Sequence, residues 1–457
     1  MGKRQKATKA GTAKDEDIVL GDDYTICSVG DADIADLDYA FENEVEISAG
    51  DADNENTDVD VKQEKFLDAI KYASDITSEK SARKRESGYK SLFKALTQYA
   101  VMSESKETLV ARLDSVVASC LTGLKASAVE QYAACRCMEA MAVLLGSNHD
   151  SYFEMIEPGL VQAIRATGKE PQVRVAALRA VSMCAFVCGT DEKATNSLLD
   201  ICEASCGKKW RGEEVPAVLR ANALDSWGLL ATTIGDLEIA SAEGRGVTIL
   251  TILQECLEES HPDLRSSAGE CFALIHESRM AIGIDDSAAE NSTAKRYRSG
   301  SWDGSEWEVL IDEVKQRMSE LAVESGHHLS KKAKKLQRST FREYMSTVVD
   351  DENPEVDIKF PGGTLTLSTW REIKQLDFVR HCLQSGFLAQ MSNNETLQDI
   401  FGADADILMD MENNKMGKVD KRLLMSKNSE QSKTNTKTLT KKRGNKQNHQ
   451  NQFLDED

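Results

Sequence analysis

The fold is decided by Val173-Arg174-Val175-Ala176-Ala177-Leu178, in which a branched apolar residue and a cation lead into an alanine-rich helical run. The pattern recurs along the chain at spacings of about 44 to 47 residues, the period of HEAT and armadillo repeats. The other copies begin at Ala82-Arg83, Val129-Glu130, Leu219-Arg220 and Leu264-Arg265. The sequence therefore predicts an all-α helical-repeat solenoid, an architecture suited to binding rather than to catalysis.

A second apolar-periodic stretch precedes each copy, so each repeat holds at least two helices that must stack on their neighbours to bury their apolar faces. The predicted partner helices lie at 109–121, 152–164, 198–202 and 247–257. Pro171, Pro216 and Pro262 fall three or four residues before a repeat arginine, where the first turn of a helix tolerates a missing N–H. The prolines thus predict three equivalent helix starts.

Arg174, Arg220 and Arg265 recur at the same point of successive repeats, and two interpretations stay open. In the favoured one they form a structural ladder, each satisfying the C-terminus of a neighbouring helix or an acidic partner. In the other they form a stripe that faces a ligand. The sequence does not show which face of the solenoid is functional.

The formal net charge of −20 over 457 residues is unevenly distributed. Residues 15–60 hold about seventeen Asp and Glu and no Lys or Arg, a composition typical of disorder. Residues 415–446 hold about eleven Lys and Arg against Asp420 and Glu430, in a run rich in Asn, Gln, Ser and Thr. A basic arm from Lys3 to Lys14 opens the chain. We expect two disordered termini.

Catalytic and cofactor motifs are missing from the sequence. It has no Walker loop, no nucleophile elbow, no His-Glu-x-x-His and no dinucleotide fingerprint, so we expect no enzyme activity and no cofactor. The eleven cysteines lie in apolar helical patterns without ligand spacing and are interpreted as small core residues. With no secretory signal and no apolar run near 18 residues, we expect a cytoplasmic or nuclear protein without a metal site.

Beyond the last repeat, residues 285–304 are predicted to form a long surface loop and residues 307–322 an amphipathic helix that caps the array. Residues 331–344 form a dense basic helix with Phe341 and Tyr344 three apart. Such a helix can neutralise phosphates, or it can be a solvated face with its aromatic rings in the core.

A small β-hairpin is predicted around Pro361-Gly362-Gly363. Ser368 is expected to cap the next helix, in which Trp370 is interpreted as a core anchor. Ser385-Gly386 should end that helix, and Ser392 with Glu395 should form a capping box for a last short helix.

Five stretches carry a resemblance to a known family, the interferon-related developmental regulators. They are Ala268-Gly269-Glu270-Cys271-Phe272-Ala273-Leu274 in the last repeat, Gln337-Arg338-Ser339-Thr340-Phe341-Arg342 in the basic helix, residues 370–378, Ser385-Gly386, and Asn394-Glu395-Thr396-Leu397-Gln398-Asp399-Ile400-Phe401. The resemblance, which covers roughly residues 62–403, implies a non-catalytic regulator of gene expression. Gln390 and Gln398 stand where it leads us to expect His and Arg in the animal members, which weakens any phosphate contact carried over to them.

The predicted organisation has four parts: a disordered segment at 1–61, an armadillo-like domain at 62–325, a C-terminal family domain at 326–403 that carries the basic helix, and a disordered basic tail at 404–457. The resemblance implies two roles that stay open. In the preferred one, the chain binds translationally silent ribosomes through rRNA. In the alternative, it is a nuclear transcriptional co-regulator that holds chromatin-regulatory proteins in the solenoid groove.

The residues predicted to contact nucleic acid are the cations of the basic helix, of the helix that follows the hairpin, and of the tail. They are Lys331, Lys332, Lys334, Lys335, Arg338, Arg342, Arg371, Lys374, Lys441, Lys442 and Arg443. In the alternative role, the last three would instead serve, together with Lys446, as a nuclear import signal.

Overall fold

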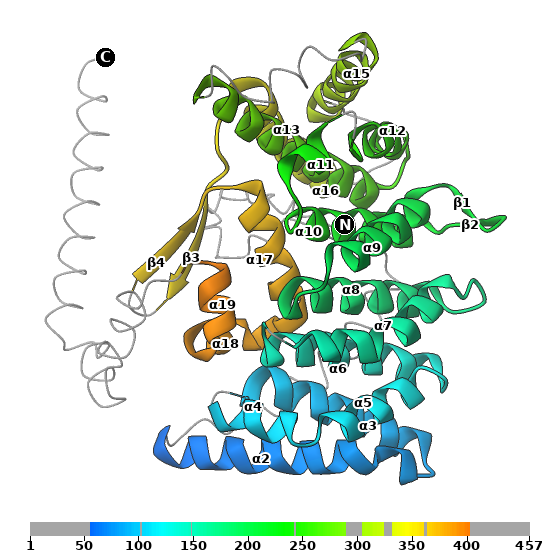
Figure 1. Cartoon of the computed structure of the whole chain (residues 1–457), viewed down its shortest axis with the longest axis vertical. Coiled ribbons are helices and arrows are strands. Elements are labelled where there is room, and N and C mark those ends of the chain that lie inside the picture. Colours follow the sequence, from blue (N-terminus) through cyan, green and yellow to red (C-terminus); the bar gives the residue numbers. More distant parts are fainter. Residues whose placement is uncertain are drawn as a thin grey trace, which may run out of the picture.

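Two parallel rows of helices run the length of the protein in the computed structural model, which describes residues 55–100, 103–147, 149–241, 244–288, 304–323, 331–360 and 363–402. In the first row each helix packs on the next. Its members are α3 (Ala82–Lys94), α6 (Ala128–Leu145), α8 (Pro171–Cys188), α10 (Ala217–Ala231), α13 (Pro262–Ala288) and α16 (Lys331–Asp350). The predicted all-α repeat solenoid is confirmed (Figure 1).

The second row supplies the partner helix of each repeat. Its members are α2 (Glu55–Asp75), α5 (Leu113–Gly123), α7 (Asp150–Arg165), α9 (Glu192–Cys206), α12 (Gly246–Leu257) and α15 (Gly304–Val323). The single helix predicted at 109–121 is in fact two, since α4 (Ser103–Val110) ends before α5 begins and Arg112 leaves the helical conformation at φ −125° and ψ 12°. The helix predicted at 307–322 is confirmed as α15. The loop predicted at 285–304 is wrong at both ends, because α13 continues to Ala288 and α15 begins at Gly304, and residues 289–303 lie outside the described residues.

Shorter elements connect the rows. They are η1 (Ile76–Ser78), the π-helix η2 (Ala95–Tyr99), α11 (Asp236–Ala240) and a hairpin of β1 (Lys209–Trp210) and β2 (Glu213–Glu214). The predicted prolines mark helix starts, since Pro171 and Pro262 are the first residues of α8 and α13 and Pro216 is the N-cap residue of α10. The boundary predicted at residue 61 falls inside α2, which begins at Glu55.

The repeat arginines form the predicted structural ladder. The Nε atom of Arg174 donates to the carbonyl of Ile164 at 2.9 Å, and that of Arg220 donates to the carbonyl of Cys206 at 2.7 Å. Arg265 repeats the arrangement with the carbonyl of Glu259. Arg174 and Arg220 therefore satisfy carbonyls at the C-terminal end of the preceding helix, and Arg265 satisfies one two residues beyond the end of α12. Helix ends lack internal donors for these carbonyls and favour positive charge.

The C-terminal part of the chain turns back along the first row. A hairpin of β3 (Val356–Phe360) and β4 (Gly363–Leu367), with Val356 opposite Leu367, leads into α17 (Trp370–Leu383). The 3-10 turn η3 (Gln384–Gly386), α18 (Phe387–Asn393) and α19 (Glu395–Ile400) follow. In Figure 1 these gold and orange helices descend beside α10, α8 and α6, and α17 contacts α13, α10 and α6. We call α17, η3, α18 and α19 the C-terminal clasp.

Two N-cap residues were predicted one or two positions too early in the sequence. Thr369, not Ser368, caps α17 and forms a capping box with Glu372, whose carboxylate accepts from the backbone N–H groups of both Ser368 and Thr369. Asn394, not Ser392, caps α19, because Ser392 donates instead to the carbonyl of Leu388 inside α18.

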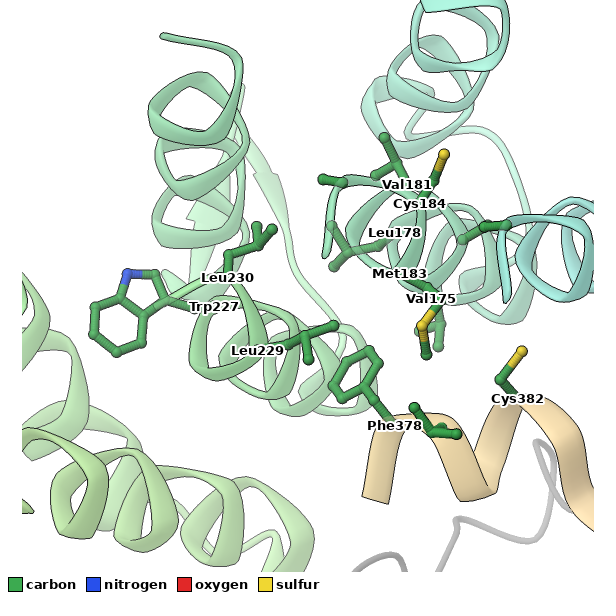
Figure 2. Close-up of a cluster of buried hydrophobic side chains, with 14 of the residues drawn as sticks. Val175, Leu178, Val181, Met183, Cys184, Trp227, Leu229, Leu230, Phe378 and Cys382 are labelled. Atoms are coloured by element: carbon green, nitrogen blue, oxygen red, sulfur yellow. The ribbon is translucent and has the colours of Figure 1, made fainter. Parts of the chain in front are cut away.

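The core runs between the two rows and beneath the clasp. Figure 2 shows the packing of Phe378 and Cys382 of α17 toward Val175 and Met183 of α8 and Leu229 of α10. Helix α8 is the one described helix long and apolar enough to cross a membrane, but most of it is buried among α6, α7 and α10. The ten cysteines in the described residues are all buried, as the core interpretation requires.

Candidate nucleic-acid interface

Helix α16 divides into a buried face and a cationic face. Gln337, Thr340, Phe341 and Tyr344 are buried, and the two aromatic rings are at most 1% exposed. On the other face Lys335 and Arg342 are exposed, and Lys334 and Arg338 are partly exposed. Lys331 and Lys332 lie in the first turn, and their side chains are outside the described set. Residues 331, 335, 338 and 342 are spaced to share one helix face, which we call the α16 stripe.

The buried face docks against a glycine. A Cβ atom at Gly269 would lie 2.7 Å from Cδ2 of Tyr344 and 3.0 Å from Cε1 of Phe341, so only glycine lets both rings reach α13 without a shift. Tyr344 stacks edge-on against Phe341 and Trp370, with ring centroids 5.6 and 5.2 Å away. Two stretches that carry the family resemblance, 268–274 and 337–342, therefore meet in one core.

The first turn of α16 holds lysines and no acidic residue. The N-terminus of a helix carries about half a positive charge, so each cation there costs about 0.3–1 kcal/mol instead of stabilising the helix. Helix dipole and lysines together concentrate positive potential at one point of the surface. An anionic ligand would offset this cost.

Lys374 does not lie on the surface. Its side chain is 3% exposed, and Nζ donates to Oδ1 of Asp225 at 3.1 Å and to the carboxylate of Glu270. In this structure an RNA phosphate cannot reach the ammonium group. We therefore correct the sequence assignment: Lys374 ties α17 to α10 and α13 and is not a nucleic-acid contact.

A fourth ionisable group, Asp377, stands near this cluster. Burial raises the pKa of Asp377 well above its ordinary value, with Glu270 as the next cause, while Lys374 and Arg380 act in the opposite direction. Its Oδ2 atom is buried without a hydrogen-bond partner in the part of the chain that the structure describes. The cluster is therefore rich in carboxylates and depends on the charge of Lys374.

Arg371 is engaged by the repeats. It donates to the carbonyl of Thr232 and to Oδ1 of Asp236, both at 2.6 Å, and its side chain is 31% exposed. Asp236 belongs to α11, so these contacts fix the start of α17 against the first-row region. Arg371 is only partly available to an external phosphate.

The remaining contacts of the clasp complement the dipole of α17. Glu277 of α13 accepts from the backbone N–H groups of Trp370 and Arg371 at 3.2 and 3.1 Å, at the positive end of the helix. Arg136 of α6 donates to the carbonyl of His381 at 2.7 Å, at the negative end. Acid at the N-terminus and cation at the C-terminus are the stabilising arrangement.

The clasp ends against the first repeat. Gln390 of α18 is 1% exposed, and Nε2 donates to the carbonyls of Leu96, Thr97 and Ala100, at 3.2, 3.4 and 2.8 Å, around the end of the π-helix η2. Gln398 donates to the carbonyl of Met391 at 3.1 Å. Gln390 therefore holds the backbone of the opposite end of the array and is not placed to contact phosphate.

The predicted site residues thus separate into three groups. The α16 cations share one helix, Arg371 and Lys374 bind the repeats, and Lys441, Lys442 and Arg443 lie outside the described residues. Sequence reasoning missed Gln390, Glu277 and Arg136 as clasp contacts. For Lys374 a signal was present, because it stands four residues after buried Trp370 and next to buried Ile373, on the apolar side of α17.

Fold and site together define an all-α repeat protein with an exposed cationic helix. The described residues contain no group of three or more His, Cys, Asp or Glu side chains that could hold a metal ion. The family model described as interferon-related developmental regulator matches residues 40–349, more than half of the chain. The chain therefore belongs to the interferon-related developmental regulator family.

Individual relatives are distant but match over most of their length. Interferon-related developmental regulator 2 of Mus musculus is 25% identical over 366 residues, covering 78% of this chain and 77% of the relative. Interferon-related developmental regulator 1 of Mus musculus is 24% identical over 399 residues, covering 85% and 82%. The Homo sapiens regulator 1 is 24% identical over 402 residues, with the same shares covered.

Proposed function

We propose that this chain is a non-catalytic regulator that binds translationally inactive ribosomes, with the α16 stripe contacting rRNA phosphates. The observation that carries the proposal is the division of α16, whose aromatic rings are buried while Lys335 and Arg342 face solvent. A cationic helix face neutralises phosphates by releasing their counterions. The basic residues Lys441, Lys442 and Arg443 would extend the contact along RNA.

The alternative role is a nuclear scaffold that holds chromatin-regulatory proteins in the solenoid groove. Helix α17 of the chain itself lies against α6, α10 and α13, which removes that stretch of the first row as a surface for a partner peptide. Because this stretch of the first row is already covered by a helix of the chain itself, we prefer the ribosomal role. The corresponding localisation is cytoplasmic.

The test is sedimentation of the tagged protein from starved and growing cells through sucrose gradients at low and high salt. We expect comigration with monosomes or free subunits that salt disperses, since phosphate contacts weaken as salt rises. A protein that stays at the top of the gradient in both states, and is found in nuclei, would support the scaffold instead.

The site itself is tested by changing Lys331, Lys332, Lys334 and Lys335 together to Glu. Ribosome association should collapse while helical circular dichroism and melting hold. The matched control changes Lys125, Lys193, Lys209 and Arg211 to Glu, which alters net charge equally at exposed positions away from α16. If both variants bind like the wild type, α16 is not the contact; if both fail equally, net charge rather than the stripe decides.

A further inference from the structure

The first row ends in two cationic helices. Helices α3 and α16 are its terminal members, and α6, α8, α10 and α13 lie between them. Five arginines of the inner helices are buried in repeat-to-repeat or clasp contacts; they are Arg136, Arg174, Arg179, Arg220 and Arg265. A sixth, Arg279 of α13, is partly exposed and lies beside the ring of Trp307. Described cations that reach the surface along this row are therefore concentrated on its two end helices.

Helix α3 carries a stripe with the same spacing as that of α16. Arg83, Ser87, Lys90 and Lys94 stand at positions i, i+4, i+7 and i+11, as residues 331, 335, 338 and 342 do. Arg83 and Ser87 are exposed, and Lys90 and Lys94 are partly exposed. We call these four residues the α3 stripe.

Neighbouring charges on α3 are engaged away from this stripe. Arg85 pairs with Glu130 of α6 through bonds of 2.7 and 3.0 Å. Glu86 accepts from the hydroxyl of Ser127 at 3.3 Å. The acidic side chain of α3 is thus turned toward the next repeat, and the stripe itself is formed by cations and one serine.

The stripe ends at an aromatic ring shared by two lysines. Nζ of Lys94 lies 5.8 Å from the ring centroid of Tyr99, and Nζ of Lys65 from α2 lies 5.7 Å from the same centroid. Burial, and then the nearby charge of Lys65, lowers the pKa of Lys94. Two like charges brought to one ring repel each other, and an anion placed beside them offsets that repulsion.

The helix start repeats the electrostatic arrangement of α16. Arg83, Lys84 and Arg85 occupy the first turn of α3, which has no acidic residue, and the Ser81 side chain makes no capping hydrogen bond. Cations at a helix N-terminus oppose the helix dipole. Lys84 pairs with Glu79 at 3.3 Å and Arg85 pairs with Glu130, so within this turn the cost falls mainly on exposed Arg83, where an anionic partner would offset it.

We propose that the α3 stripe, with Lys65 and Tyr99, is a second RNA-phosphate contact, engaged by the same ribosome that binds α16. The inference rests on the proposed function. Five steps of helix packing at about 8–10 Å each separate α3 from α16, so the path along the row between the two contacts is about 40–50 Å. A rigid array with contacts at that separation selects a large folded RNA over a short single strand.

The test uses the full chain with Lys65→Glu and Arg83→Glu together, since both side chains are exposed and the fold should tolerate the change. Affinity for purified ribosomes is measured between about 50 and 200 mM salt. Each phosphate contact contributes about five-fold in affinity near 0.15 M salt, given a slope of about −0.9 per contact. Losing two contacts should weaken binding about 30-fold and reduce the salt slope by about 1.8.

The matched control is Lys193→Glu with Lys209→Glu, which makes the same charge change at exposed sites on α9 and the β1–β2 hairpin. It should bind within about two-fold of the wild type. If the α3 variant binds as tightly as this control, the second contact is wrong and the α16 proposal stands. If the wild type does not bind ribosomes at all, the proposed function fails with it.

Discussion

Replacing Lys374 by Met removes the cation that holds α17 to α10 and α13. The variant keeps the length of the side chain but leaves the carboxylates of Asp225 and Glu270 without their shared ammonium group, and the Glu270 side chain is only 1% exposed. Removing one partner of a buried ion pair costs about 3–5 kcal/mol. We expect a loss of that size, confined at first to docking of the clasp.

The assay is hydrogen exchange across α17 and α18, because a repeat array opens locally and a single unfolding midpoint would average over it. Protection of α17 should fall in Lys374→Met. It should recover in the double variant Lys374→Met with Glu270→Met, because the ammonium group and the buried carboxylate of Glu270 are then both removed and no unpaired charge is left there. Ribosome affinity of the double variant should match the wild type. If protection of α17 is unchanged in the single variant while RNA binding weakens, Lys374 is not the residue that holds α17 to the repeats.

Two further predictions address the same core. Asp377→Asn should stabilise the clasp at neutral pH. A carboxyl whose pKa is raised in the folded state contributes stability that is complete below its ordinary pKa and lost as pH rises through the raised value. Exchange protection of α17, corrected for the intrinsic pH dependence of exchange, should therefore fall between about pH 4 and 8 in the wild type and change less in the variant; the same pH dependence in both proteins would contradict the prediction. Gly269→Ala should cost about 1–3 kcal/mol by pushing Tyr344 and Phe341 away from α13, read as lost exchange protection in α16. Its control is Gly168→Ala, where a Cβ meets no atom within 4 Å, and equal protection in both variants would argue against the packing.

Much of the solenoid could be predicted from the sequence because its determinants are local. A period near 45 residues, prolines at helix starts and arginines at a fixed point of each repeat all act within one repeat or between neighbours. Arg220 illustrates this, since its carbonyl partner Cys206 is only 14 residues away. Patterns of that range are visible in a single chain.

The clasp could not be predicted because its contacts join distant residues. Lys374 meets Glu270 across 104 residues and Asp225 across 149, and Gln390 reaches Ala100 across 290. A lysine on an amphipathic helix is exposed by default, so pairing it with a buried carboxylate requires the tertiary path of the chain. The same default placed Lys374 among the predicted RNA contacts.

The clasp also decides how the two cationic ends can act together. In a solenoid each repeat contacts only its neighbours, so small rotations between repeats accumulate and the distance between the ends varies. Helix α17 is bound to α13 through Glu277 and to α6 through Arg136, and Gln390 of α18 binds the backbone of the first repeat. These contacts restrict rotations between the repeats. Clasp residues can thus affect RNA affinity without touching RNA, because a fixed separation lowers the entropy lost when both stripes bind. Loosening the clasp should then weaken two-ended binding more than binding through α16 alone.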